Sequence, residues 1–108
     1  MAIPQFSGVT VSAKANVYFE GRVVSHGITL PDGTKKSVGV ILPATLTFAT
    51  VAPETMEGVA GACEYKLPGS EAWVRSGPGE KFSVPGNTTF DIRVAAESTA
   101  YHYICHFG

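Results

Sequence analysis

Short runs of β-forming residues, each closed by a cluster of turn formers, recur along this chain. Val, Ile, Phe, Tyr and Thr dominate the runs, which is typical of strands, and no helical period lasts long enough to compete. Clusters such as Pro31-Asp32-Gly33 and Gly77-Pro78-Gly79 separate the runs. The predicted strands cover residues 18–25, 37–42, 45–50, 56–59, 63–67, 72–75, 81–84, 89–94 and 100–107. Strands at this spacing predict an all-β fold, either a jelly roll or a small barrel.

The length of the chain fits one domain. A chain of 108 residues is of ordinary single-domain size, and 44% hydrophobic residues are enough to build a core. Residues 1–15 are weakly patterned and include Pro4 and Gly8, so we interpret them as an N-terminal arm that is either loosely ordered or laid against a partner. Residues 16–108 are predicted to form the β-domain.

Charge and targeting signals argue against several classes of protein. A net charge of −1 without a basic stripe disfavours nucleic-acid binding. The first residues contain no apolar run of signal-peptide length, and no segment reaches the roughly 20 apolar residues that cross a bilayer. We therefore expect a cytoplasmic protein without a membrane partner. Cys63 and Cys105 form no CxxC pair and are expected to be buried, reduced thiols, with a place in a ligand pocket as the alternative for Cys105.

Two stretches framed by Gly and Pro share an informative spacing. Six residues separate Glu54 from Gly61, and five separate Gly79 from Pro85. Together these spacings resemble both halves of the cupin signature, which implies the cupin form of the jelly-roll β-barrel. Cupins usually place two His and one Glu in the first stretch and another His in the second. Here only the Glu is kept, and Phe48, Thr50 and Phe90 replace the histidines.

The replaced histidines change the chemistry that the barrel can support. Side chains alternate along a strand, so Leu46, Phe48 and Thr50 point into the barrel under this correspondence, as does Phe90. A lone Glu54 cannot hold a transition metal, which requires three or four protein ligands. We therefore expect no metal and no other cofactor. The barrel mouth is predicted to be an apolar, hydroxyl-lined pocket with one carboxylate, suited to a flat base joined to a sugar.

A longer set of residues makes the resemblance more specific. The matching residues are 36–43, 47–50, 52–54, 56, 61, 67–71, 73, 79, 82, 84–85, 90 and 94. In this order and at these distances, they resemble the pyrimidine/purine nucleoside phosphorylase family of small cupins over residues 18–107. The resemblance implies a homodimeric enzyme, a glycosyltransferase of nucleoside metabolism. Such an enzyme uses phosphate as co-substrate to cleave many purine and pyrimidine ribonucleosides into free base and ribose 1-phosphate.

The chain departs from that family at two places. It reads Ala44-Thr45-Leu46 where relatives typically have Gly-Glu-Tyr, and residues 103–107 read Tyr-Ile-Cys-His-Phe where relatives commonly have Tyr-Leu-Cys-Arg-Tyr. His106 thus replaces an arginine. Arginine binds phosphate through two parallel hydrogen bonds, whereas histidine offers fewer donors and a charge that depends on pH. If this position faces the pocket, phosphate affinity is expected to be weaker or strongly dependent on pH.

Candidate catalytic residues follow from the reaction. Its transition state has oxocarbenium character, so the site must hold phosphate near the sugar C1′ and stabilise positive charge on the sugar. We predict Glu54 to accept hydrogen bonds from the ribose hydroxyls and to stabilise the cation. We predict Thr50 to donate to phosphate or ribose, and Phe48 or Phe90 to stack on the base.

The remaining predicted substrate contacts are Met56, Tyr103 and His106. Tyr103 and His106 lie on opposite faces of the last strand, and the sequence leaves open which face points inward. Two other functions also remain open at this point. One is a protein that binds a nucleoside-like molecule without turning it over, favoured by the changes at 44–46 and His106. The other is a metal-dependent cupin such as a dioxygenase or isomerase, disfavoured by Phe48 and Phe90.

Overall fold

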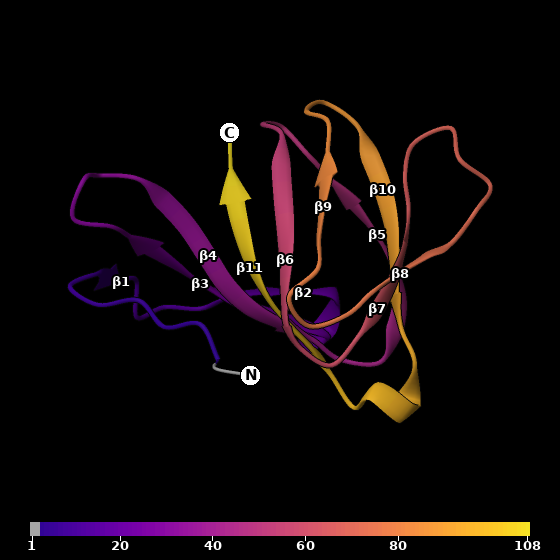
Figure 1. Cartoon of the computed structure of the whole chain (residues 1–108), viewed down its shortest axis with the longest axis horizontal. Helices are drawn as coiled ribbons and strands as arrows, with labels where there is room; N and C mark the ends of the chain where they lie inside the picture. Colours follow the sequence, from indigo (N-terminus) through magenta and orange to yellow (C-terminus); the bar gives the residue numbers. More distant parts are fainter. Residues whose placement is uncertain (1–2) are drawn as a thin grey trace.

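The chain folds into two antiparallel β-sheets that pack against each other around one core (Figure 1). The structure is a computed structural model and describes residues 3–108. The larger sheet has the strand order β1-β3-β4-β11-β6-β9, with β2 paired to β3, and the smaller sheet has the order β5-β10-β7-β8. The all-β prediction is therefore confirmed. No helix in the described part of the chain is long and apolar enough to cross a membrane.

The strand bounds agree with the sequence predictions most closely in the second half of the chain. In chain order, the elements are β1 (Thr10–Val11), β2 (Asn16–Tyr18), η1 (Phe19–Gly21), β3 (Val23–Thr29), β4 (Lys35–Ile41), β5 (Ala44–Ala49), β6 (Glu54–Ala60), β7 (Cys63–Lys66), β8 (Val74–Ser76), β9 (Lys81–Val84), β10 (Thr89–Val94), η2 (Ala96–Ser98) and β11 (Tyr101–Phe107). The predicted strands 81–84 and 89–94 coincide with β9 and β10. The single strand predicted at 18–25 is wrong, because a 3₁₀ turn divides it.

That turn, η1, reverses the chain through three successive residues with positive φ. Phe19, Glu20 and Gly21 have φ values of 52°, 55° and 89°. Only glycine adopts this region at little cost, so Phe19 and Glu20 are held there by their surroundings. The reversal folds β2 back onto β3, with Asn16 opposite Ser25. The sequence signalled the turn through Gly21 alone.

The described part of the N-terminal arm lies against the domain's own larger sheet. Within it, β1 pairs with the edge of β3, Thr10 opposite Thr29 and Val11 opposite Ile28. Pro4 and Phe6 lie over the outer face of the sheet, where they help to line a shallow apolar depression. Residues 4–6 thus lie over the larger sheet of the same chain, and β1 extends its edge.

The core lies between the sheets and is rich in aromatic rings. Tyr65 stacks on Phe82 with ring centroids 3.9 Å apart, and Phe82 meets the edge of Phe90 at 6.2 Å. Phe90 stacks on Phe48 at 5.6 Å, and Phe48 meets Phe19 at 5.3 Å. Such ring pairs contribute about 0.5–1.5 kcal/mol each beyond their buried area. The series passes through the buried Phe82 and Phe90 to the partly exposed Phe19, and so connects the core with the surface.

Two glycines with similar backbone conformations provide a test of the packing. Gly61, between β6 and β7, has φ +71°, and a Cβ there would collide with the carbonyl oxygen of Ala100. Gly69 has φ +76° with nothing within 4 Å of such a Cβ. We predict that Gly69→Ala lowers the free energy of unfolding by about 1–2 kcal/mol, the cost of the conformation alone. Gly61→Ala is expected to cost at least about 2 kcal/mol more, because the β6–β7 turn must also move away from Ala100, which precedes β11. Urea denaturation measures both losses, and equal losses would contradict the predicted close packing.

Candidate functional site

A cavity of about 480 Å³ opens between the two sheets. This volume is within the usual range for a small-molecule site. Its lining divides by chemistry. Aromatic and aliphatic side chains come mainly from the smaller sheet and η1, whereas hydroxyl, amide, thiol and carboxyl groups come mainly from β2 and the larger sheet. The cavity therefore presents a ring-lined wall and a polar wall to the same ligand.

Phe48 and Phe90 form the centre of the ring-lined wall. They lie directly opposite each other on β5 and β10, and their rings are nearly parallel, at 19°. Phe90 is 3% exposed, whereas Phe48 is half-buried and Phe19 at the rim is 40% exposed. Met56, on β6, lies deep in the cavity. The predicted inward face of β5 and β10 is confirmed at Phe48 and Phe90, and the exposed part of the rings is a platform for a flat ligand.

Glu54 is the carboxylate of the cavity. It is the first residue of β6, where its side chain meets Cys105 of β11, and the Cys105 thiol donates to its Oε1 over 3.5 Å. Burial raises the pKa of Glu54, and the hydrogen bond from Cys105 partly opposes this rise. Burial also raises the pKa of Cys105 to about 12, so the thiol keeps its proton. Both described cysteines are free and buried, as the sequence predicted, and Cys105 occupies the pocket position that was its alternative.

The polar wall is completed by three residues that sequence reasoning missed. Asn16 of β2, Ser25 of β3 and Ser37 of β4 line the cavity beside the predicted Tyr103 of β11. Phe19 was also missed. A signal was available in the repeated Ser-x-Gly of Ser25-His26-Gly27 and Ser37-Val38-Gly39, because small residues two apart on neighbouring strands leave space on one face of a sheet.

Thr50 lies behind the cavity rather than in its lining. Its side chain is 5% exposed, and the hydroxyl donates to the Pro85 carbonyl oxygen at 2.7 Å and accepts from the Thr88 N–H at 3.2 Å. Both bonds join the end of β5 to the loop between β9 and β10. Because the Thr50 hydroxyl is hydrogen-bonded to the backbone, the residue stabilises the structure here. The contact with phosphate or ribose that was predicted from the sequence does not fit this position.

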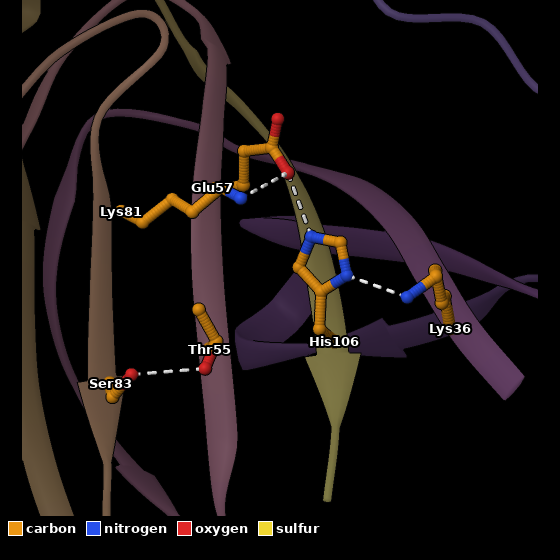
Figure 2. Close-up of polar contacts among 6 residues, drawn as sticks. All are labelled: Lys36, Thr55, Glu57, Lys81, Ser83 and His106. Atoms are coloured by element: carbon orange, nitrogen blue, oxygen red, sulfur yellow. Dashed lines mark hydrogen bonds and ion pairs between the residues drawn. The ribbon is translucent and has the colours of Figure 1, made fainter.

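His106 lies on the outer face of the larger sheet (Figure 2). Lys36 donates from Nζ to its Nδ1 at 2.7 Å, and its Nε2 donates to the Glu57 Oε1 at 2.8 Å. A neutral imidazole with its proton on Nε2 satisfies both contacts. Alternation along β11 therefore turns Tyr103 and Cys105 inward and His106 outward. His106 therefore lies outside the cavity, where it cannot make the substrate contact predicted from the sequence.

The structure brings together five of the seven predicted site residues. Glu54, Phe48, Phe90, Met56 and Tyr103 line one cavity, while Thr50 and His106 lie outside it. Within residues 3–108, no three or more His, Cys, Asp or Glu side chains gather in a group that could hold a metal ion.

Two facing antiparallel sheets with a ligand-sized cavity between them define a small cupin-like jelly roll. A model of the family described as "Pyrimidine/purine nucleoside phosphorylase" matches residues 13–107. The chain belongs to this family. Proteins of that name from Paracidovorax citrulli and from Polaromonas sp. are 70% and 69% identical to it over 108 residues, the full length of each chain.

Solved structures show the same fold. A protein of unknown function from Acinetobacter sp. is 43% identical, with a TM-score of 0.91 over 96% of this chain and 98% of that chain. A structure of FeII HppE shares the fold alone, at 11% identity and a TM-score of 0.70, over 99% of this chain and 64% of that chain. The barrel is therefore shared well beyond the family.

The buried carboxyl predicts a pH dependence of stability. Because burial raises the pKa of Glu54, the folded state binds a proton that the unfolded state releases, and stability falls as pH rises through the window above the ordinary Glu value. Glu54→Gln removes this titration. As pH is lowered from about 7 to about 4, the melting temperature of the wild type should rise relative to that of Glu54→Gln. The matched control is Glu71→Gln at an exposed carboxylate. Parallel melting curves for wild type and Glu54→Gln across this range would contradict the prediction.

Proposed function

We propose that this protein is a nucleoside phosphorylase of broad specificity. It cleaves purine and pyrimidine ribonucleosides with inorganic phosphate and releases free base and ribose 1-phosphate. The observation that carries the proposal is the placement of Glu54 in one cavity with the exposed rings of Phe48 and Phe19. That arrangement offers a stacking surface for a base and a carboxylate for a sugar, and the family of the chain agrees with it.

The chemistry requires stabilisation of a positively charged sugar. A phosphate oxygen bonds to C1′ while the C1′–N bond breaks, and the electron pair of that bond leaves with the base. The proton carried by hydrogen phosphate ends on the base, so atoms and charge balance. Because C1′ and the ring oxygen are electron-poor in the transition state, a carboxylate nearby stabilises them more than it stabilises the ground state. Glu54 is assigned this role, together with acceptance of hydrogen bonds from ribose hydroxyls.

Broad base preference follows from the way in which the base is held. Every nucleobase has an aromatic face, and stacking on Phe or Tyr side chains contributes about 1–3 kcal/mol per base with little regard to sequence. The Phe48 and Phe90 wall offers faces and edges of rings rather than hydrogen-bonding groups. It therefore suits purines and pyrimidines alike.

The proposed reaction needs no metal. Phe48 and Phe90 occupy inward positions at which other cupins carry histidine, and their rings offer no lone pair to a metal ion. Stabilisation of the positive charge on the sugar is assigned instead to the carboxylate of Glu54. We further propose that the enzyme works as a homodimer in the cytoplasm. Analytical ultracentrifugation and fractionation of cells that express it test these two points.

Phosphorolysis itself is tested by base release from inosine, uridine and cytidine, with and without phosphate. We expect release only with phosphate. Glu54→Gln should lower kcat by about 10²-fold or more, because it removes charge stabilisation made in the transition state. Glu71→Gln is again the matched control, and should turn over as the wild type does. Ligand binding without base release would instead identify a binding protein, and an unchanged kcat in Glu54→Gln would remove Glu54 from the mechanism.

The stacking role of Phe48 has its own test. Phe48→Leu keeps an apolar side chain but removes the ring, so the KM for purine and pyrimidine nucleosides alike should rise by about fivefold or more. The KM for phosphate should change little, since the ring does not contact the anion in this proposal. Val51→Ala, at a neighbouring side chain that is 84% exposed, serves as control. A rise confined to one class of base would show that Phe48 selects between bases instead.

A further inference from the structure

Two neighbouring strands of the larger sheet carry reciprocal serine and glycine pairs. In the β3–β4 register, Ser25 lies opposite Gly39, and Gly27 lies opposite Ser37. Residues directly opposite each other in an antiparallel pair share a face of the sheet. Each serine therefore has a hydrogen atom rather than a side chain across from it. The result is a recess in the cavity wall with two hydroxyls in it.

Tyr103 reaches into this recess because position 39 is a glycine. Gly39 lies between Ser25 and Tyr103 in the sheet, paired with both. A Cβ on Gly39 would lie 2.7 Å from the Tyr103 Oη and 2.9 Å from the Ser25 Cβ. The phenol thus extends across Gly39 toward β3. Asn16, opposite Ser25 on β2, adds its amide from the other side.

The three hydroxyls of the recess are buried, Asn16 is exposed, and all four side chains can donate hydrogen bonds. Ser25, Ser37 and Tyr103 are 6%, 9% and 7% exposed. The Ser25 hydroxyl accepts a long contact, 3.5 Å from the Asn16 Nδ2, and also interacts with the Tyr103 phenol, whereas the Ser37 hydroxyl interacts with the Cys105 thiol. Burial raises the pKa of Tyr103, a rise that the hydrogen bond with Ser25 only partly opposes, so its phenol keeps the O–H donor. All three hydroxyls line the cavity, where a bound acceptor can take their hydrogen bonds.

We propose that the hydroxyl recess, formed by Asn16, Ser25, Ser37 and Tyr103, binds the phosphate co-substrate through neutral O–H and N–H donors. This inference rests on the proposed function. Phosphate oxygens accept hydrogen bonds, and four side-chain donors converge here. Ribose hydroxyls, in contrast, can donate to the carboxylate of Glu54. The donors of the recess thereby bind phosphate, while the Glu54 acceptor binds the ribose of the nucleoside.

The position of the recess also suits the direction of attack. The recess belongs to the larger sheet with β2, whereas Phe48 and Phe90 belong to the smaller sheet across the cavity. A base stacked on the rings and a phosphate in the recess leave the ribose between them. The phosphate oxygen then approaches C1′ from the side opposite the departing base, which is the alignment that an in-line displacement needs.

Conservative variants of the recess test the inference. Ser37→Ala and Tyr103→Phe each remove one donor and little volume, and each should raise the KM for phosphate about tenfold or more. The KM for the nucleoside should stay within about twofold, because these groups do not hold the base or the ribose. Ser83→Ala is the matched control, since Ser83 lies outside the barrel, bonded to the Thr55 hydroxyl at 3.0 Å (Figure 2). Melting temperatures without phosphate confirm that each variant folds.

A binding measurement separates this inference from the proposed function. Inorganic phosphate should raise the melting temperature of the wild type and of Ser83→Ala, but much less that of Ser37→Ala or Tyr103→Phe. That pattern supports phosphate binding in the hydroxyl recess even if no nucleoside is cleaved. Phosphorolysis with an unchanged KM for phosphate in both recess variants would overturn the inference and leave the function standing. Equal thermal shifts in all four proteins, or no shift in the wild type, would also overturn it.

Discussion

The register of β11 between β4 and β6 is the constraint on which the core and the site both depend. One strand supplies Tyr101 to the core, Tyr103 and Cys105 to the cavity, and His106 to the outer surface. A shift of one residue would reverse every one of these side chains. Contacts on both sides fix the register. On β4, only glycine at position 39 leaves room for the Tyr103 phenol, and on β6, Met56 lies opposite Cys105. Packing and chemistry therefore select the same pairing.

The cavity is built from groups that do not favour folding by themselves. Glu54 is partly removed from water, and the hydroxyls of Ser25, Ser37 and Tyr103 are buried in the cavity lining. Most rings of the aromatic series from Tyr65 to Phe19 lie across the cavity from the hydroxyls, on the smaller sheet and η1. Burial of such rings, at about 1.5–3 kcal/mol for a large apolar side chain, offsets the cost of the polar wall. The rings that pack the core, such as Phe82, and the rings available to a ligand, such as Phe48, thus belong to one series of contacts.

Local pattern was enough to predict much of this structure. Strand composition located β9 and β10 to the residue, and the spacing of Glu54, Gly61, Gly79 and Pro85 indicated the cupin-like barrel. The resemblance of this spacing to the cupin signature also predicted that Glu54, Phe48 and Phe90 line the same cavity, because they lie at fixed offsets from the turn residues.

The rest depended on information that is not local. Ser25, Ser37 and Asn16 become neighbours only through register, and η1 uses positive φ at two residues that are not glycine. The hydroxyl of Thr50 is bound by a loop 35 residues further along the chain. The inward face of β11 followed from its neighbours, since both faces carry polar groups and neither reads as the core from sequence.

Gly39 and Tyr103 share a single volume, which has a consequence for how the barrel can change over time. A methyl group at position 39 would need the space that the phenol now fills, and it would also lie 2.8 Å from the backbone carbonyl oxygen of Val24. Descendants of this chain should therefore keep glycine at position 39 even where Tyr103 changes. A change at position 103 alone would then record when the phenol was lost from the recess.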